Sequence, residues 1–476
     1  MSGAFVPVDR LRATIADQRL QSAIYTATGR LIEKRAEVVS PEVLPDHQEL
    51  REQAHRVKRH TLENLDYYLE QLEANVIAHG GRVVWCGTGE EVADLVLGLV
   101  RQRGASLIVK SKSMTTEEID LNERLEHHRL QAVETDLGEY ILQLAHERPY
   151  HIVAPALHKT RYEVADLFAD RLGVERDVVI ENQTLTARRV LRERFLAAGM
   201  GITGANFLVA DSGAVVIVEN EGNARLTSSA PPIHIVIAGI EKVVPRAQDL
   251  AVFLKLLGRS ATGQPLTVYT SFLSGPRRPG ELDGPEEFYL VLLDNGRTKL
   301  LSNASKRESL FCIRCGACLN HCPVYRRIGG HNYPGTYSGP IGAIITPQYR
   351  GVMTHPWLPF ASSLCGACAE VCPVKIDIPR LLLELRSEVA HERSGVERFA
   401  FRAFAWIAAH PRAYTLITAM TARLAPRGEN GWLRRLPFFA RFGVLEKWLS
   451  QRDIPAPASQ SFRQYWRSRA KGGGAS

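Results

Sequence analysis

Cysteine clustering is the feature that most constrains this chain. Eight cysteines are present in 476 residues, and all but Cys86 fall between residues 312 and 372. The first four form the pattern Cys-x2-Cys-x2-Cys-x3-Cys-Pro, which begins at Cys312 and ends at Cys322-Pro323. In this spacing three thiolates surround one cubane iron–sulphur cluster, and the fourth cysteine ligates a second cluster. The pattern therefore predicts a two-cluster centre.

A second copy of the motif follows, but its first cysteine is missing. The copy comprises Cys365, Cys368 and Cys372-Pro373, and it repeats the spacing of Cys315, Cys318 and Cys322-Pro323. Ser362 stands where the counterpart of Cys312 is expected. The repeat predicts two similar loops that differ in one ligand.

Cross-ligation assigns these residues to two sites. The first cluster site takes Cys312, Cys315, Cys318 and Cys372, which is a full set for [4Fe–4S]. The second cluster site takes Cys322, Cys365 and Cys368, so one of its iron corners lacks a cysteine. We expect this second centre to be [3Fe–4S], or [4Fe–4S] with a non-cysteine ligand. Candidates for that ligand are Ser362, Ser363, solvent and a partner.

Zinc is the main alternative cofactor for clustered cysteines. Structural zinc sites use two spaced pairs and are closed by four ligands. Two triplets that each end in Cys-Pro do not match that pattern, so iron is favoured. Cys86 stands alone at the end of a predicted strand and is interpreted as a small buried hydrophobic residue.

The sequence before the cysteines alternates between helical and strand-like segments. Residues 11–78 are mostly helical in pattern, and strands are predicted at 82–86, 106–110, 151–154, 233–238 and 288–293. This alternation is typical of an α/β domain with a mainly parallel sheet. The spacer Asp211-Ser212-Gly213 separates two apolar runs and predicts a hairpin.

Four parts are expected along the chain. They are an N-terminal helical segment (1–65), an α/β domain (66–300), a helical two-cluster ferredoxin domain (301–390) and a basic aromatic C-terminal extension (391–476).

The net charge of +8 is concentrated in that extension. Residues 398–420 mix aromatic and basic side chains, which suits docking on an acidic partner or peripheral contact with a membrane surface. Docking is favoured, because an electron carrier must approach its donor and acceptor closely. No nucleic-acid-binding motif is recognised. With no apolar run of about 18 residues and no signal peptide, a cytoplasmic location is expected.

Several motifs in the α/β region resemble a known family. Residues 201–213, 219–225 and 231–234 resemble the LUD domain of lactate-utilisation proteins. Together with the cysteine module and the basic extension, the resemblance covers roughly residues 20–470. It implies a LUD domain similar in fold to sugar-phosphate isomerases.

The same resemblance implies a role as a non-autonomous oxidoreductase subunit that transfers electrons while L-lactate is oxidised to pyruvate. It also implies two partners, a second iron–sulphur subunit and a smaller LUD-domain subunit. One alternative is an electron-transfer subunit for the oxidation of another 2-hydroxy acid, such as glycolate. Another is a redox-sensing assembly component. The electron acceptor is left open. No flavin-binding pattern stands out in the sequence. Oxidation of a 2-hydroxy acid needs a group that accepts two electrons, and that group could lie on a partner subunit.

Side-chain chemistry nominates a few residues for substrate handling. Arg225 could hold a carboxylate in a bidentate fork, and His234 could accept a proton from a 2-hydroxy acid. Lys110 and Lys112 follow a predicted strand, where α/β sheets usually bind ligands. The simpler interpretation pairs Arg225 with Glu219 and places His234 in the core, and for His234 the simpler one is favoured.

Overall fold

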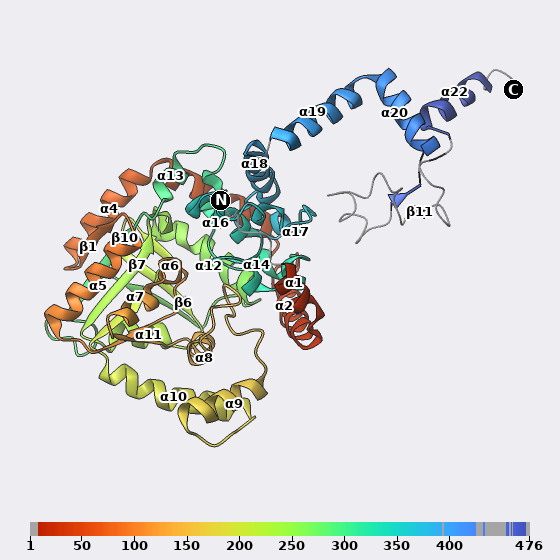
Figure 1. The fold of residues 1–476 in the computed structure, drawn as a ribbon. Coiled ribbons are helices and arrows are strands. Elements are labelled where there is room, and N and C mark those ends of the chain that lie inside the picture. Colours follow the sequence, from red (N-terminus) through yellow and green to blue (C-terminus); the bar gives the residue numbers. More distant parts are fainter. Residues whose placement is uncertain are drawn as a thin grey trace. The chain divides into compact units, whose positions relative to one another are not determined.

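The computed structural model describes residues 8–392, 395–424, 432–433, 454–456, 458 and 460–472. The chain divides into two compact units, Met1–Val389 and Ala390–Ser476. Figure 1 traces both along the sequence. The first unit contains the α/β region and all the cysteines, so the candidate site lies within it.

Four helices open the first unit, as the apolar periodicity of residues 11–78 predicts. They are α1 (Val8–Ala16), α2 (Gln18–Val38), α3 (His47–Glu63) and α4 (Leu65–Ala78). The Asp17 side chain caps α2 by accepting the N–H of Leu20, which satisfies one of the free donors at the helix start.

A six-stranded sheet, parallel throughout, forms the centre of the α/β region (Figure 1). Its strands run in the order β1-β10-β7-β4-β2-β3. Their bounds are β1 (Arg82–Cys86), β2 (Leu107–Lys110), β3 (Gln131–Glu134), β4 (Met200–Thr203), β7 (Ile233–Gly239) and β10 (Glu287–Leu293). The predicted mainly parallel α/β domain is thereby confirmed.

Helices connect these strands, as parallel neighbours require. They are α5 (Gly89–Arg103), α6 (Met114–Glu118), α7 (Leu121–His127), α8 (Leu137–Ala145), α9 (Arg161–Leu172), α10 (Ile180–Ala197), α11 (Asn223–Ser229) and α12 (Ala247–Ala261). A further helix, α13 (Arg297–Leu301), follows the last strand, β10.

A second sheet of four strands has the order β8-β5-β6-β9. It consists of β5 (Phe207–Val209), β6 (Ala214–Glu219), β8 (Val243–Val244) and β9 (Tyr269–Leu273). Strands β5 and β6 pair antiparallel around residues 211–213, so the predicted hairpin is correct.

The parallel sheet has a core on each face, because side chains alternate along its strands. On one face Ile235 and Ile237 of β7 pack with α5 and α7. On the other face Val236 and Ala238 belong to a larger core shared with α3, α4, α12 and the second sheet. That larger core continues into the cysteine region and includes Cys318. One core therefore joins the α/β domain to the predicted cluster domain.

Short helices carry the cysteine region, as expected. They are η2 (Arg307–Phe311), α14 (Ala317–Asn320), α15 (Tyr325–Ile328), η3 (Gly330–Asn332), α16 (Gly339–Arg350), η4 (Leu358–Phe360), α17 (Ala367–Glu370) and α18 (Ile378–His391). A further short turn, η1 (Ile240–Lys242), follows β7.

One predicted strand is wrong. Residues 151–154 form bends rather than a strand, because the ring Nδ1 of His151 accepts the N–H groups of Val153 and Ala154 at 3.1 and 3.2 Å. Side-chain bonds of this kind compete with strand pairing. The other ring nitrogen, Nε2, donates to Asn320 Oδ1 of α14 at 3.1 Å, so the bend connects the α/β domain to the cysteine region.

The second unit contains α19 (Gly395–Ala409), α20 (Pro411–Leu424), the short pair β11 (Trp432–Leu433) and β12 (Ile454–Pro455), and α22 (Phe462–Gly472). Pro411 begins α20, where a proline is tolerated because its missing N–H would be unpaired anyway. Prolines at 426 and 437 predict further helix breaks in the sequence, and both positions lie outside the described residues. Among the described helices none has both the length and the apolar character needed to cross a bilayer.

Candidate iron–sulphur centre

The two cysteine motifs fold alike. Gly316 and Gly366 precede α14 and α17 with left-handed φ angles of 74° and 85°. Two residues before each glycine, Arg314 and Leu364 also take positive φ angles of 61° and 55°. Non-glycine residues rarely adopt this conformation, so the shared pair of left-handed residues shows that the sequence repeat is also a structural repeat.

Ser362 occupies the structural position of Cys312. The N–H of Arg314 donates to Cys312 Sγ at 3.4 Å, and the N–H of Leu364 donates to Ser362 Oγ at 3.1 Å. The same turn therefore presents a thiol in one motif and a hydroxyl in the other. Arg386 holds this second turn through a bond from Nη2 to the Ser362 carbonyl at 2.9 Å.

The thiols expected at the first site interact with one another. Burial raises the pKa of Cys315 to about 12, with further contributions from Cys372 and Cys312. Burial likewise raises the pKa of Cys318 well above its usual value, with Cys312, Cys315 and Cys372 contributing and Cys368 contributing less. Cys372 belongs to the second motif, so the fold brings it to three cysteines of the first.

The thiols expected at the second site form another group. Burial raises the pKa of Cys368 to about 12, and Cys322 and Cys365 contribute. Cys365 is exposed, and hydrogen bonds from the N–H of Ala367 and the hydroxyl of Ser363 lower its pKa. The second group is therefore more open than the first.

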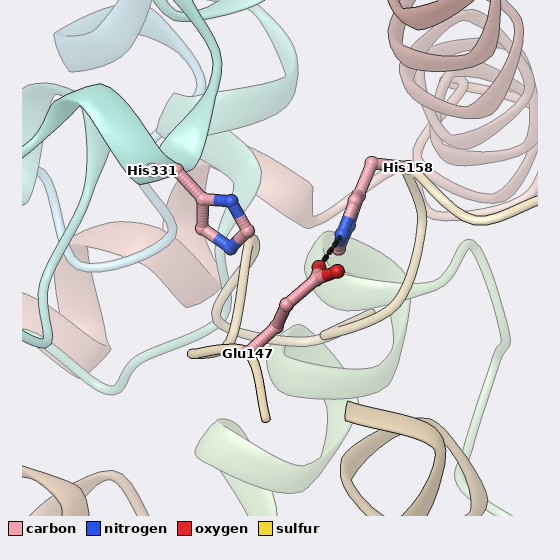
Figure 2. A group of neighbouring side chains, drawn as sticks. All are labelled: Glu147, His158 and His331. Atoms are coloured by element: carbon pink, nitrogen blue, oxygen red, sulfur yellow. Dashed lines mark hydrogen bonds and ion pairs between the residues drawn. The ribbon is translucent and has the colours of Figure 1, made fainter. Parts of the chain in front are cut away.

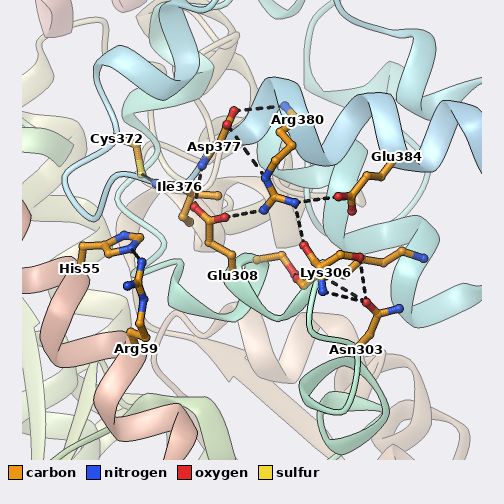
Figure 3. A network of polar contacts seen from close by, with 12 residues as sticks. His55, Arg59, Asn303, Lys306, Glu308, Cys372, Ile376, Asp377, Arg380 and Glu384 are labelled. Carbon is orange, nitrogen blue, oxygen red and sulfur yellow. Dashed lines mark hydrogen bonds and ion pairs between the residues drawn. The ribbon is translucent and has the colours of Figure 1, made fainter.

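Backbone N–H groups also point at the cysteines that follow each short helix. The N–H of Tyr325 donates to Cys322 Sγ, and the N–H of Ile376 donates to Cys372 Sγ, both at 3.4 Å. Figure 3 shows the second of these beside a polar network in which the N–H of Asp377 donates to Glu308 Oε1 at 2.8 Å. Arg380 then pairs with Glu308 at 2.6 Å, so the segment after Cys372 is held to η2.

Five buried cations surround the first group of thiols. Each interacts electrostatically with Cys312, Cys315 or Cys372, and the five are Arg35, Arg51, Lys58, Lys242 and Arg314. Arg51 also donates from Nε to the Cys372 carbonyl at 2.9 Å. Burying cations is unfavourable unless anionic charge lies nearby. The Glu241 carboxylate supplies some of this charge to Lys58, Lys242 and Arg314. A cluster with thiolate ligands would supply more, so these residues fit an iron–sulphur cofactor.

The spacing of the thiols also argues against zinc. Two groups of His, Cys, Asp and Glu side chains in the described part of the chain have ligand atoms within 4.8 Å of one another, and neither contains a cysteine. A tetrahedral zinc with Zn–S bonds of about 2.3 Å would bring its sulphurs to roughly 3.8 Å from one another. Among the described residues, no three thiols lie as close together as a tetrahedral zinc ion requires.

The two groups whose ligand atoms lie within 4.8 Å of one another are outside the cysteine motifs. Figure 2 shows one of them, in which His158 Nε2 bonds Glu147 Oε2 at 2.8 Å and His331 lies beside the pair. Lys159 also pairs with Glu147. This group ties the turn after α8 to η3 of the cysteine region.

The other group comprises Glu117, Glu134 and Glu139. Lys110, fully buried at the end of β2, pairs with Glu134 at 2.7 Å and Glu117 at 3.2 Å. Burial acts to lower the pKa of Lys110, but these carboxylates outweigh it, so the pKa lies above its usual value. Lys110 is thus engaged in an internal ion cluster.

The remaining nominated residues lie apart. His234 is buried inside β7, where Thr203 Oγ1 is 2.8 Å from Nε2, and burial lowers its pKa to about 3. The Arg225 guanidinium stacks over Tyr269 at 5.0 Å, while the carboxylate of Glu219 accepts the backbone N–H of Arg225. Lys112 donates from Nζ to the Val153 carbonyl at 2.6 Å. The structure does not bring Arg225 and His234 into one site.

Residue-level prediction missed the cations that the N-terminal helices bring to the cysteines. Arg51 and Lys58 lie seven residues apart on α3, in helical phase with buried Ala54 and Leu62. Charged residues within an otherwise apolar helix face indicate a buried partner. This shared helical phase is the sequence signal that could have identified Arg51 and Lys58 as buried cations. Cys86, by contrast, is buried as predicted, and burial raises its pKa to about 11.

Three family models match successive parts of the chain. The LUD domain matches residues 69–293, the 4Fe-4S dicluster domain residues 308–376, and the model described as lactate utilisation protein B, C-terminal, residues 385–471. Fold and site together therefore define a LUD-domain protein with iron–sulphur clusters.

Curated relatives cover nearly the whole chain. Lactate utilization protein B of Bacillus licheniformis is 43% identical over 468 residues, 97% of this chain and 96% of its own. The Bacillus subtilis protein of that name is 42% identical, covering 97% and 96%. The chain belongs to the lactate utilization protein B family. A solved DUF162 family structure from Deinococcus radiodurans aligns with a TM-score of 0.28 at 9% identity, covering 48% of this chain and 98% of its own.

Proposed function

We propose that this chain is an electron-transfer subunit of a system that oxidises L-lactate to pyruvate. Family membership supports a role in lactate utilisation. The observation that carries the electron-transfer step is the gathering of seven cysteines from two motifs into two groups, six of them in or against one core and the seventh, Cys365, exposed. Iron–sulphur clusters exchange single electrons over a wide range of potentials, which suits a carrier between a substrate and an acceptor.

Cross-ligation gives the composition of the two centres. Cys312, Cys315, Cys318 and Cys372 would hold a [4Fe–4S] cluster. Cys322, Cys365 and Cys368 would hold the second cluster, with its fourth corner facing the turn that presents Ser362. Support for Ser362 comes from its hydrogen bond to Leu364, which repeats that of Cys312 to Arg314. The centre is then a [4Fe–4S] cluster with a serine ligand, or [3Fe–4S] when that iron is lost.

The partners would be a second iron–sulphur subunit and a smaller LUD-domain subunit, and the two-electron entry point would lie on one of them. The C-terminal unit offers a surface for such docking. Phe399, Phe404 and Trp406 of α19 expose 73%, 67% and 58% of their surface. Exposed aromatic side chains among basic residues are typical of protein interfaces. A redox-sensing assembly component would use the same docking surface. Electron transfer is therefore distinguished from redox sensing by whether the substrate reduces the clusters, and not by docking.

Cluster absorbance in the presence of substrate tests the proposal. The iron-loaded chain is mixed anaerobically with its partner subunits and L-lactate, and bleaching of the visible absorbance is followed. We expect bleaching with L-lactate that needs the partners. Bleaching by glycolate in preference to L-lactate would reassign the substrate, and no reduction in any combination would contradict electron transfer.

A further inference from the structure

A cavity of about 270 Å³ lies where the LUD domain meets the cysteine loop. Its walls include residues 111–115 after β2, 204–206 after β4 and 219–221 at the end of β6 and just after it, together with Lys242 and Arg314. All belong to the first unit. Pockets for small molecules usually start near 300 Å³, so this one suits a very small ligand.

The cavity also lies at the point where the sheet topology changes direction. Strands β2 and β4 are neighbours, but the chain leaves β2 for β3 on one side and leaves β4 for β7 on the other. Parallel α/β sheets bind ligands outside the carboxyl ends of the strands at such a switch point. Residues 111–115 and 204–206 follow those carboxyl ends directly.

Arg314 brings a cation with free donors to this cavity. The residue is 9% exposed, and neither Nη1 nor Nη2 has a hydrogen-bond partner within the described chain. Its ion pair with Glu241 Oε1 is long, at 3.7 Å. The other oxygen of Glu241 is taken by Arg297 Nε at 2.5 Å. Buried guanidinium donors are normally satisfied, and a carboxylate is the ligand that fits their planar fork.

Lys242 adds positive charge beside Arg314. Lys242, also 9% exposed, lines the cavity, and so does Lys112, of which one donor is used by the Val153 carbonyl. The cavity therefore has a cationic end.

The carboxylates of Asp136, Glu219 and Glu221 also line the cavity. Glu219 holds the start of α11 by accepting the N–H groups of Ala224 and Arg225 at 2.8 and 2.9 Å. Glu221 accepts the N–H of Leu137 with Oε2 at 3.1 Å. A ligand with a carboxylate and a hydroxyl would match this lining, because the cations can bind its carboxylate and the carboxylates can accept its hydroxyl hydrogen.

We propose that this junction cavity binds a small 2-hydroxycarboxylate such as L-lactate, with Arg314 and Lys242 holding its carboxylate and Glu219 or Glu221 accepting its hydroxyl. The inference rests on the proposed function for its choice of substrate, but it concerns binding alone. Arg314 lies between Cys312 and Cys315, so the bound acid would lie beside the first cluster site. Arg314 and Lys242 are then binding residues contributed by different domains.

Binding is measured directly by anaerobic equilibrium dialysis of radiolabelled L-lactate against the iron-loaded full-length chain without partners. We expect one saturable site. Propionate, which lacks the hydroxyl, should compete about tenfold more weakly, as expected for losing one hydrogen bond to a charged group. Propionate competing as well as L-lactate would overturn the hydroxyl assignment.

Two variants and one control assign the residues. Lys242→Gln and Arg314→Lys should each weaken binding by about tenfold or more, because a charge-assisted bond or a bidentate fork is lost. Lys255→Gln removes the same charge from the exposed side of α12, outside the cavity, and should leave binding unchanged. Iron and sulphide contents show that each variant retains its clusters.

The outcomes separate this inference from the proposed function. No saturable binding, or binding unaffected by both variants, overturns the cavity assignment even if the clusters are reduced when partners are added. Saturable binding that depends on Arg314 and Lys242 supports the cavity even if no electron reaches the clusters, a result that would contradict the electron-transfer role instead.

Discussion

The two groups of cysteines are related by a sequence repeat but lie in contrasting surroundings. The first group has four thiols, with Cys315 and Cys318 buried, and five buried cations around it. The second has three thiols, one of them the exposed Cys365. The pKa values of its thiols respond to burial, to backbone N–H groups, to the Ser363 hydroxyl and to one another. One repeat has thus produced a closed site and an open one.

This contrast teaches that ligand spacing does not by itself set the behaviour of a cluster. Net charge, hydrogen bonds to sulphur and exposure all adjust the reduction potential. Buried cations stabilise the more negative, reduced state, so the first cluster should have the higher potential. Electrons would then collect at the closed site, and the open site would exchange them with a partner.

Removing one closing cysteine from each site gives the largest expected effect. Cys372→Ala should remove the first cluster and Cys322→Ala the second, because each cysteine joins the group formed mainly by the other motif. Each variant should lose about half of the iron. Low-temperature EPR of the reduced proteins should show complementary losses. If Cys322→Ala instead abolished the first centre, cross-ligation would be wrong.

Iron removal should distinguish the sites by rate. A chelator reaches an exposed ligand more readily, so the second cluster should be lost first when the oxidised protein is treated with an iron chelator. Absorbance and EPR sampled over time should show two phases, with the first-site signal persisting. A single phase, or prior loss of the first-site signal, would contradict the difference in exposure.

Ser362→Cys should make the two sites alike. A fourth thiolate would retain the iron that the serine corner releases, so the [3Fe–4S] signal expected after mild oxidation of the natural protein should disappear. Ser363→Cys is the matched control one residue away and should keep the signal. Loss of the signal in the control variant alone would place the open corner beside Ser363.

Lys58→Met should produce the smallest change. A unit charge about 8 Å away at an effective dielectric constant near 20 contributes about 2 kcal/mol, or on the order of 90 mV for one electron. The variant should lower the first potential by tens of millivolts and leave the second within error. EPR-monitored redox titration measures both. Equal shifts in the reduction potentials of the two clusters would contradict the expectation that Lys58 acts mainly on the first.

Much of the fold follows from local patterns. The apolar run at β7 and the spacer at 211–213 predict a strand and a hairpin that the structure contains. Strands β3 (QAVE) and β4 (MGIT) are missed because polar residues or a glycine interrupt them, whereas β2, of the same length, has the unbroken apolar run Leu107–Val109. The predicted strand at 151–154 fails because the His151 ring bonds its own neighbouring backbone, a contact that no apolar pattern reports.

The candidate site, like the fold, is only partly predictable from the sequence. Cysteine spacing predicts which thiols share a group, because in this motif the closely spaced cysteines share one cluster and the last cysteine ligates the other. The cations from α2 and α3 reach the cysteines only through tertiary packing, as when Arg35 donates to the Val371 carbonyl at 3.2 Å. Arg225 and His234 were nominated by chemistry alone, and the structure separates them, because strand interiors and helix surfaces face different surroundings.

Mössbauer spectroscopy of the oxidised, 57Fe-loaded chain tests the inequality of the two sites most directly. We expect one [4Fe–4S] component with four cysteine-ligated irons. We also expect a second component that is either [3Fe–4S] or contains one iron with a distinct, oxygen-ligated signature. Two indistinguishable [4Fe–4S] components with all irons bound by cysteine would contradict this inequality.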